Sequence, residues 1–249
     1  MTALETRRLC KSFGALTVAD NIDFRLEPGA RHALIGPNGA GKTTFVNMLM
    51  GAVSPSSGEI FLGGEEITHT GQSSRVRRGL GRTFQITTLF RSLPVLDNVA
   101  LAVAERRGVA RRMWRAASAH REIIDESREL LGTLGIGDDA LLRVADLPYG
   151  KQRLVEIALA LGLRPKVLLL DEPAAGVPSQ ETEKILANLE RLPSEIAILI
   201  IEHDMDLVFR FARRITVLVQ GAVLVEGTPE EIARDRRVHQ VYLGEGHHA

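Results

Sequence analysis

The sequence lacks several features that would place a protein in a special class. It has a single cysteine, Cys10, so no disulfide can form within the chain, which suits a reducing cytosol. Its longest purely apolar runs, residues 196–201 among them, are far shorter than the ~20 residues that a helix needs to span a bilayer. An N-terminal apolar targeting segment is not expected either, because Glu5, Arg7 and Arg8 interrupt the beginning of the chain. If the protein acts at a membrane, we therefore expect it to do so through a partner.

A net charge is also missing. Lysine plus arginine number 31 and aspartate plus glutamate number 31, so no overall field favours nucleic acid as a partner. With 249 residues, 45% of them hydrophobic, the chain is long enough to bury one substantial core or a core with an inserted subdomain. The composition therefore predicts a compact globular protein without a nucleic-acid partner.

The most informative stretch is residues 36–44, with the sequence GPNGAGKTT. It follows the apolar run 33–35 and precedes the apolar-periodic segment 45–50, so we expect a strand, a tight loop and a helix. Glycine accepts positive φ and brings no Cβ, so the backbone can curl around a phosphate chain whose charge the helix N-terminus favours. The pattern predicts a phosphate-binding loop. The alternative, a merely structural glycine turn, is disfavoured by this context.

The residues of this loop are candidate nucleotide contacts. Lys42 supplies a full charge for the β and γ phosphates, and the Thr43 hydroxyl is placed to ligate Mg²⁺. On its own the loop predicts only that the protein binds a nucleotide. The candidate contacts are Gly36, Pro37, Asn38, Gly39, Ala40, Gly41, Lys42, Thr43 and Thr44.

Two later apolar runs end in polar side chains. Residues 167–170 lead into Asp171 and Glu172, the pattern of a strand that is buried on both faces of a parallel sheet. Open α/β sheets bind ligands at the carboxyl ends of their strands, so we expect Asp171 near Mg²⁺ and Glu172 near the attacking water. Residues 196–201 likewise lead toward His203, a candidate γ-phosphate contact. The alternatives are an acid pair that caps a turn and a structural histidine.

Each of three further sequence features has two possible interpretations. Phe13 could stack on a nucleotide base, or be an ordinary core phenylalanine. Gln85, at the exit of a strand, could ligate Mg²⁺ or hold water, or be a solvated loop residue. Five arginines fall within residues 106–115 and could contact an acidic partner or lipid headgroups. For these arginines we favour a solvated face whose stems cover apolar surface.

Secondary-structure signals fill the rest of the chain. Turn residues such as Gly14 and Pro28 divide short apolar runs, which predicts strands. Helical spacing and the scarcity of glycine and proline predict a helical insertion in residues 95–135. Strands are expected at residues 5–13, 22–27, 30–35, 59–62, 79–85, 166–171, 196–201, 215–219 and 223–225. Further helices are expected at residues 45–50, 72–78, 154–163 and 179–191, the last with Ser179 as its N-cap, and after Pro229.

The order of these motifs is more specific than any one of them. The phosphate loop, Gln85, a helix start at Tyr149 and Gly150, the acid pair at the end of a strand, and His203 follow one another along the chain. In this order the chain resembles the ATPase subunit of ATP-binding cassette transporters over essentially its full length. It is most similar to the branched-chain amino acid importer group, on the strength of RTFQ at 82–85, LFR at 89–91, LPYG at 147–150, DEPAAG at 171–176, IEHDM at 201–205 and YLGE at 242–245.

The resemblance implies an α/β fold. Its core would be that of a P-loop NTPase, with a mixed, largely parallel sheet, an N-terminal antiparallel β subdomain and an inserted α-helical subdomain. Residues 1–249 would form a single ATPase domain, with the core at 1–88 and 163–249 and the inserted subdomain at about 89–162.

The resemblance also implies roles for individual residues. Phe13 would stack on adenine, while Lys42 and the rest of the loop would hold the triphosphate of ATP. Around the Mg²⁺ ion would stand Thr43, Gln85 and Asp171.

Catalysis and dimerisation would involve residues from two parts of the chain. Glu172 would polarise the attacking water, and His203 would sense the γ-phosphate. Tyr149, Gly150 and the helix behind them would complete the ATP site of a second ATPase subunit.

The implied partners are that second subunit, identical or related, two transmembrane permease subunits and, indirectly, an extracytoplasmic solute-binding protein. The chain would then lie in the cytoplasm, peripheral on the inner face of the plasma membrane. Branched-chain amino acids are the favoured cargo, with urea or a short-chain amide as the closest rival. A non-transport ATPase of the same fold and a binding module with a degenerate ATP site are further alternatives.

The chain departs from the family pattern at two places. The family signature is usually Leu-Ser-Gly-Gly-Gln, and here Pro148, Tyr149 and Lys151 replace its serine, first glycine and glutamine. Lys151 could add a cation near phosphate. In the loop after the catalytic glutamate, Pro178 stands where the family ordinarily has Asp or Asn, and proline removes a backbone N–H. We expect these departures to weaken the contact across the dimer or to make the two ATP sites unequal.

Overall fold

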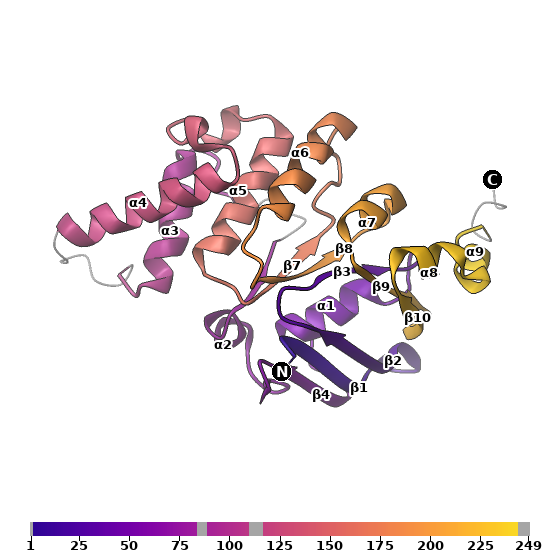
Figure 1. Cartoon of the computed structure of the whole chain (residues 1–249). Coiled ribbons are helices and arrows are strands. Elements are labelled where there is room, and N and C mark those ends of the chain that lie inside the picture. The colour runs from indigo at the N-terminus through magenta and orange to yellow at the C-terminus, as the bar shows by residue number, and fades with distance from the viewer. Residues whose placement is uncertain (1, 84–88, 110–116, 244–249) are drawn as a thin grey trace.

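The computed structural model describes residues 2–83, 89–109 and 117–243, which are built around two β-sheets (Figure 1). In the larger sheet β3 pairs in parallel with β8 and β9, and β7 pairs in parallel with β6 and β8. Its edge strand β10 is antiparallel to β9. The order of its strands is β10 (Ala222–Gly227), β9 (Arg214–Val219), β3 (Arg31–Ile35), β8 (Ala197–Ile201), β7 (Val167–Asp171) and β6 (Leu80–Arg82).

The smaller sheet is antiparallel. Its strands follow the order β2 (Leu16–Leu26), β1 (Leu4–Phe13), β4 (Ser57–Leu62) and β5 (Glu65–Glu66). The helices of the described residues are α1 (Lys42–Met50), α2 (Gln72–Arg77), α3 (Val95–Arg106), α4 (Ala117–Thr133), α5 (Tyr149–Gly162), α6 (Ser179–Glu190), α7 (Met205–Phe211), α8 (Pro229–Arg234) and α9 (Arg236–Leu243). Short 3₁₀ turns lie at Gly137–Asp139 and Val144–Asp146.

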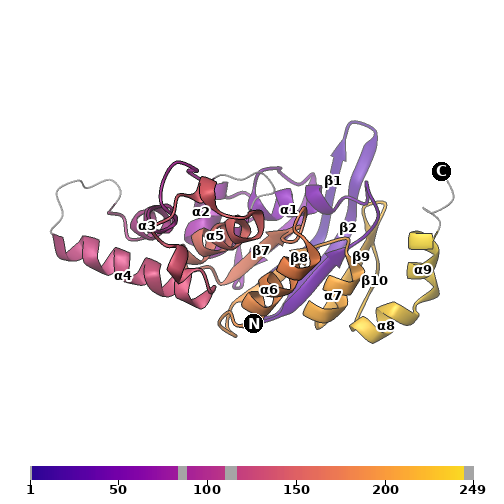
Figure 2. The ribbon, with the colours of Figure 1, turned by 90° about the horizontal axis from the view of Figure 1, so that it is seen from above.

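The central strands are buried on both faces, as their continuous apolar sequences predict. In β7, Leu168 and Leu170 pack in a core with helices α3 to α7, whereas Val167 and Leu169 pack in a second core with α1 and the smaller sheet. Strand β8 alternates in the same way between the two cores. The larger sheet is thus the middle layer, with α1 and α2 on one side of it and α3 to α7 on the other (Figure 1). Viewed from above, α4 lies at one end of the molecule and α9 at the other (Figure 2).

These layers confirm the predicted fold class, and four details of the prediction are wrong. Strand β2 begins at Leu16, well before residue 22, because Gly14 at φ +59° allows a tight hairpin directly after Phe13. Helix α5 begins at Tyr149, which confirms the helix start expected at Tyr149 and Gly150 but not the range 154–163, since Pro148 has a φ suited to a helix entrance. The N-cap of α6 is Pro178 and not Ser179. Helix α7 was not predicted, although the Asp204 side chain caps it by accepting from two backbone amides.

Helix α1, which follows the predicted phosphate loop, is fixed at its C-terminal end by a buried arginine. Arg75 is 1% exposed, and its guanidinium donates to the carbonyls of Met48 and Leu49, both at 2.6 Å. It also donates to the carbonyls of Thr68 and Thr70. These carbonyls lie at a helix end and in a turn, where backbone oxygens can still accept, so Arg75 ties α1 to the segment before α2.

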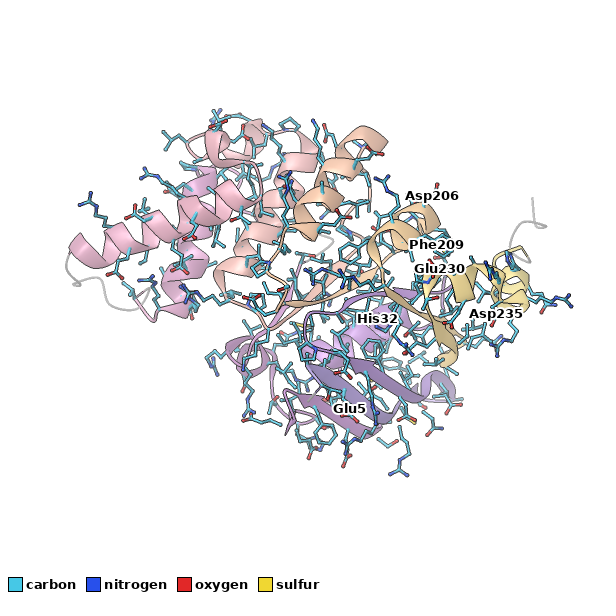
Figure 3. The ribbon with its side chains drawn as sticks, in the orientation of Figure 1. Glu5, His32, Asp206, Phe209, Glu230 and Asp235 are labelled. Carbon is cyan, nitrogen blue, oxygen red and sulfur yellow. The ribbon has the colours of Figure 1, made fainter. Side chains whose placement is uncertain are left out.

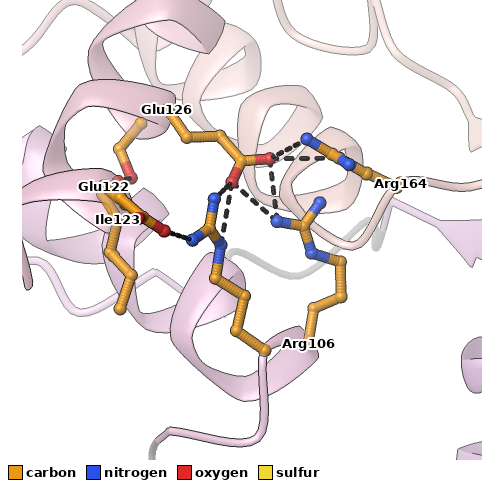
Figure 4. Close-up of polar contacts among 7 residues, drawn as sticks. Arg106, Glu122, Ile123, Glu126 and Arg164 are labelled. Atoms are coloured by element: carbon orange, nitrogen blue, oxygen red, sulfur yellow. Dashed lines mark hydrogen bonds and ion pairs between the residues drawn. The ribbon is translucent and has the colours of Figure 1, made fainter. Parts of the chain in front are cut away.

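Helices α3, α4 and α5 come between β6 and β7 and pack on one another. The C-terminal ends of α3 and α5 meet the middle of α4 at the Glu126 carboxylate, which accepts from Arg106, Arg107 and Arg164 (Figure 4). Burial alone would raise the pKa of Glu126, but the hydrogen bonds from Arg106 and Arg107 outweigh it and lower the pKa. Two of the five clustered arginines are therefore paired within the protein, and the other three lie outside the described residues. The division into a core and an inserted subdomain at about 89–162 stays a prediction.

Replacing Glu126 by Gln should destabilise the protein by about 2 kcal/mol, because a carboxylate that is 12% exposed and holds three guanidinium groups is lost. The matched control is Glu122→Gln on the same helix, whose carboxylate is 69% exposed and should contribute no more than ~0.5–1 kcal/mol. Urea unfolding of both variants measures the difference. Equal losses would show that the three-arginine cluster adds nothing to an ordinary surface pair.

A buried histidine lies between the two sheets. His32 of β3 (Figure 3) is 1% exposed and packs edge-on against Phe24, and its Nε2 is 2.8 Å from the Thr216 hydroxyl. Thr216 donates its own proton to Glu226 at 2.9 Å, so it accepts from a protonated Nε2 of a neutral ring. Burial lowers the pKa of His32 to about 4, although the nearby Glu226 carboxylate opposes the shift.

The His32 pKa predicts a loss of stability in acid. In the unfolded chain the imidazole binds a proton below about pH 6.5, whereas in the folded protein it does so only near pH 4, so stability falls as the pH is lowered through this window. The full contribution is roughly 3 kcal/mol. Urea unfolding of the wild type and of His32→Leu at pH 7, 6, 5 and 4 should show a shallower pH dependence in the variant. Parallel curves would contradict the assignment.

Candidate nucleotide site

The predicted phosphate loop lies between backbone segments that leave no room for a side chain at Gly36 or Gly41. A Cβ on Gly36 would lie 2.1 Å from the Leu218 carbonyl oxygen of β9, and one on Gly41 would lie 2.3 Å from the Val18 carbonyl oxygen of β2. The amide of Gly221, in the turn between β9 and β10, donates to the Ala40 carbonyl at 3.0 Å. The loop is therefore a rigid feature of the fold, fixed by both sheets.

The loop delivers an open helix N-terminus. Gly39 has φ +76°, so its backbone adopts the left-handed conformation. No atom lies within 4 Å of the position that a Cβ would take, so neighbouring residues do not cover this side of the loop. Helix α1 follows with Gly41 at its N-cap, no side-chain cap and no acidic residue in its first turn. The first amides of a helix have no internal acceptor, and the dipole there favours negative charge. A bound phosphate would supply the missing acceptor, so the residues present fit a phosphate group.

The side chains of the loop add cationic and hydroxyl groups. Lys42 Nζ donates to the carbonyl oxygens of Gly36 at 2.5 Å and of Pro37 at 2.9 Å, so its charge is held over the loop. Thr43 is exposed and Thr44 is half-buried at the start of α1. Asn38 is exposed beside Gly39. Residues 36–44 thus form one continuous loop and the start of α1. The contact of each of these residues with phosphate stays a prediction.

Asp171 ends β7 in a buried polar cluster that the sequence did not predict. Its Oδ2 accepts from Arg82 at 2.5 Å, and Arg82 also donates to the Asn47 side chain of α1 at 2.7 Å. Asp171 is 6% exposed. Arg82 thus joins the end of β6 to both β7 and α1. The contact of Arg82 with Asp171 depends on the pairing of β6 with β7. The sequence alone does not show that these two strands are neighbours.

Glu172 and His203 meet at the ends of neighbouring strands. Parallel pairing of β7 with β8 places Asp171 opposite Ile201, and His203 Nδ1 then lies 3.9 Å from Glu172 Oε1. The Glu172 side chain is 29% exposed and that of His203 is 68% exposed. Glu172 has φ +46°, a conformation that costs a non-glycine residue about 1–3 kcal/mol and that clusters at functional sites. The two residues are thus accessible, close together and held by their surroundings.

A second acid, Glu202, lies behind this pair and was not predicted as a site residue. It is 2% exposed, and its two oxygens accept from the backbone amides of Ala174 and His203, both at 3.2 Å. Burial raises the pKa of Glu202, although these two amide hydrogen bonds oppose the shift. A glutamate directly after an apolar strand was the signal, but the functional interpretation of this strand end was given to His203.

Two other predicted contacts have different outcomes. Phe13 is 52% exposed at the end of β1, with the Lys11 ammonium 4.8 Å from its ring centroid. The interpretation as a core residue is therefore wrong, and stacking on a base stays a prediction. Gln85 lies outside the described residues, so the structure places neither its side chain nor its predicted bond to Mg²⁺.

Tyr149 and Gly150 begin α5 away from the phosphate loop. The Tyr149 ring covers Gly176, where a Cβ would lie 3.4 Å from it, and its hydroxyl accepts from Arg153 at 2.7 Å. A Cβ on Gly150 would lie 2.2 Å from a carboxylate oxygen of Glu181. Helix α5 packs on α3, α4, α6 and β6, whereas α1 packs on β2. Within one chain, the two predicted anion-binding helix starts thus belong to different parts of the fold.

Lys151 does not face a phosphate site as a lone cation. Its Nζ donates to both carboxylate oxygens of Asp139, at 2.9 and 2.7 Å. Asp139 is 9% exposed, so the pair is held against the protein and neutralises the lysine. The suggestion of an added cation near phosphate is therefore not supported.

Two other kinds of site are absent from the part of the chain that the structure describes. Among the helices of residues 2–83, 89–109 and 117–243, none has the length and apolar character that a membrane span requires. In the same described ranges no group of three or more His, Cys, Asp or Glu side chains could hold a metal ion. Magnesium at a nucleotide site is commonly held by one or two protein oxygens together with phosphates, so such a cluster is not required.

Comparison with known proteins agrees with this geometry. Residues 19–175 match the family described as ABC transporter, and residues 222–248 match the one described as branched-chain amino acid ATP-binding cassette transporter. The chain is 37% identical to the high-affinity branched-chain amino acid transport ATP-binding protein BraF of Pseudomonas aeruginosa, over 97% of this chain and 98% of BraF. It is equally 37% identical to LivG of Escherichia coli K12, a protein of the same description, with the same shares covered.

A solved structure shows the same fold along the whole chain. The ADP conformation of MJ1267, an ATP-binding cassette of an ABC transporter, superposes with a TM-score of 0.85 at 27% identity, covering 98% of this chain and 99% of MJ1267. The sequence matches span both the phosphate loop and the strand that ends in Asp171. Together with the geometry of the site they show that the chain belongs to the ATP-binding cassette transporter family, as one of its ATP-binding subunits.

Proposed function

We propose that this chain hydrolyses ATP to drive an importer of branched-chain amino acids. The observation that carries the proposal is the meeting of Glu172 and His203 at the ends of β7 and β8, next to β3 and the phosphate loop that β3 leads into. The relatives BraF and LivG, and the match of residues 222–248, favour this cargo over others.

Different residues of this site would have different roles in the transfer of the γ-phosphoryl group to water. The amides at the start of α1 and Lys42 would hold the β and γ phosphates and stabilise the charge that develops on them. Glu172 would orient and polarise the attacking water as a general base. His203, 3.9 Å from Glu172, would donate a hydrogen bond to a γ-phosphate oxygen, and Phe13 would stack on adenine.

Magnesium fits the oxygen donors at this site. The Thr43 hydroxyl and the Asp171 carboxylate are the hard ligands that Mg²⁺ prefers, with Gln85 as a proposed third ligand. Bound there, the ion would supply positive charge to the β and γ phosphates. Arg82 already bonds Asp171 Oδ2, so it would orient this carboxylate while the metal is held.

A second ATPase subunit would complete each site. Tyr149 and Gly150 start a helix whose first turn has no acidic residue and no side-chain cap, which suits an anion. They lie away from α1 in the same chain, so we propose that they act on the ATP of the partner subunit. The Tyr149 ring on Gly176 would link that contact to the loop after Glu172. Pro148 and Pro178 stand at the entrances of α5 and α6, and any inequality of the two sites stays a prediction.

The remaining partners would be two transmembrane permease subunits and, indirectly, an extracytoplasmic solute-binding protein. The chain would be peripheral on the cytoplasmic face of the membrane through these permeases. The cargo itself would never touch the chain, so a urea or short-chain amide importer is the rival that shares every residue of the site. Two further alternatives are a module that binds ATP without turnover and a non-transport ATPase. The hydrolysis experiment below distinguishes the first from the proposed function, and the uptake experiment distinguishes the second.

Replacing Glu172 by Gln should lower the rate of MgATP hydrolysis by about 10²-fold or more, because the general base is lost, and leave ATP affinity within about twofold. Phosphate release and equilibrium ATP binding measure the two effects. The exposed Glu183→Gln on α6 is a matched control, since its carboxylate pairs with Arg210 and touches neither strand end. Normal turnover in Glu172→Gln would refute the assigned role.

Cells that contain the complete transporter should take up leucine, isoleucine and valine in a manner that depends on Glu172. Uptake of each radiolabelled amino acid, of urea and of acetamide is compared between cells with the wild-type chain and cells with Glu172→Gln. We expect only the branched-chain amino acids to lose uptake in the variant. Loss confined to urea or acetamide would retain the ATPase and reject the cargo.

A further inference from the structure

The buried Glu202 carboxylate connects the two loops that carry Glu172 and His203. One oxygen accepts from the amide of Ala174, two residues after Glu172, and the other accepts from the amide of His203. The second oxygen also lies 3.8 Å from His203 Nδ1. A single carboxylate, 2% exposed, thus binds both segments at once.

The strained backbone of Glu172 is held from the same strand. The Glu172 amide donates to the Ile201 carbonyl at 2.9 Å, and the next contact along the loop is the bond from Ala174 to Glu202. Between these two points the backbone turns through φ +46° at Glu172. Two consecutive residues at the end of β8 therefore hold the two sides of the turn. A left-handed glutamate persists only where such contacts over-determine it.

We propose that Glu202 is a positioning residue for ATP hydrolysis, which holds the turn at Glu172 and sets its side chain against that of His203. The inference rests on the proposed function, because it assigns a role relative to Glu172 and His203. Glu202 touches neither nucleotide nor water and acts through the two residues that would. Without it, the loop from Pro173 onward loses its bond to β8, and Glu172 can leave the conformation in which it faces His203.

The bonding pattern makes a carboxylate the best side chain for this position. Both hydrogen bonds to Glu202 come from backbone N–H groups, and an ionised carboxylate accepts from both. Glutamine has the same length, but it has one acceptor oxygen and presents its NH₂ group to the other donor. Methionine has a similar shape and lacks a strong acceptor. The three side chains therefore form a graded series of two, one and no hydrogen bonds.

The test compares Glu202→Gln and Glu202→Met in the full-length chain. We expect kcat for MgATP hydrolysis to fall about tenfold in the first variant and about 10²-fold in the second, since small misplacements of a catalytic group have effects of this size. The KM for ATP, the equilibrium binding of ATP and the thermal unfolding midpoint are measured for each. We expect KM and ATP affinity to stay within about twofold of the wild type, because the phosphate loop is unchanged.

The matched control is Asp206→Asn. Asp206 is an exposed acid of α7 (Figure 3). It lines the same surface cavity as Glu202 and Ala174, so it reports the loss of a nearby charge without the loss of the connection. Its kcat should equal that of the wild type.

Three outcomes would overturn the inference: wild-type kcat in Glu202→Gln, an equal fall in Asp206→Asn, or a fall in kcat that follows the unfolding midpoint across the series. If Glu202→Met does not fold, the comparison of Glu202→Gln with Asp206→Asn decides alone. A wild-type chain that hydrolyses no ATP would overturn the proposed function and this inference together. Wild-type hydrolysis that is abolished in Glu172→Gln and kept in Glu202→Gln overturns only the inference.

Discussion

Parallel pairing of β3, β8 and β7 is the constraint on which the rest of this structure depends. Because the three strands run in one direction, their carboxyl ends share one edge of the sheet. The phosphate loop leaves β3 at that edge, His203 follows β8, and Glu172 follows β7. The apolar sequences of these strands, buried in two cores, therefore determine which polar residues meet.

The polar residues that meet there are held by the backbone as much as by side chains. Gly36 and Gly41 fit against carbonyl oxygens of β9 and β2, which fixes the loop between the two sheets. Arg75 binds the carbonyls at the far end of α1, and Arg82 connects α1 to Asp171. Both ends of the helix are thus attached to neighbouring elements. A rigid helix start of this kind can bind phosphate without first paying the entropy of ordering a loop.

Much of this arrangement could be predicted from the sequence, for reasons that differ between residues. The phosphate loop and the Asp171–Glu172 strand end follow from local patterns, since glycine spacing and apolar runs depend on nearby residues alone. The fold class followed from the order of the motifs and the family resemblance that this order supports. Arg82, Glu202 and the position of Tyr149 on Gly176 depend on which strands and helices are neighbours, which no local pattern states. The exposure of Phe13 could not be predicted for the same reason. The local sequence around an aromatic residue at a strand end is the same whether neighbouring elements bury its side chain or leave it exposed. Helix α7 is short, and its cap at Asp204 was overlooked beside the candidate His203.

We propose that triphosphate binds at the shared carboxyl edge of β3, β8 and β7. A crystal structure of the Glu172→Gln chain with Mg²⁺ and ATP tests this proposal directly. We expect the β and γ phosphates on the amides of residues 36–44 and a γ-phosphate oxygen within hydrogen-bond distance of His203. A nucleotide bound elsewhere, or one that leaves this loop and His203 without contacts to phosphate, would contradict it.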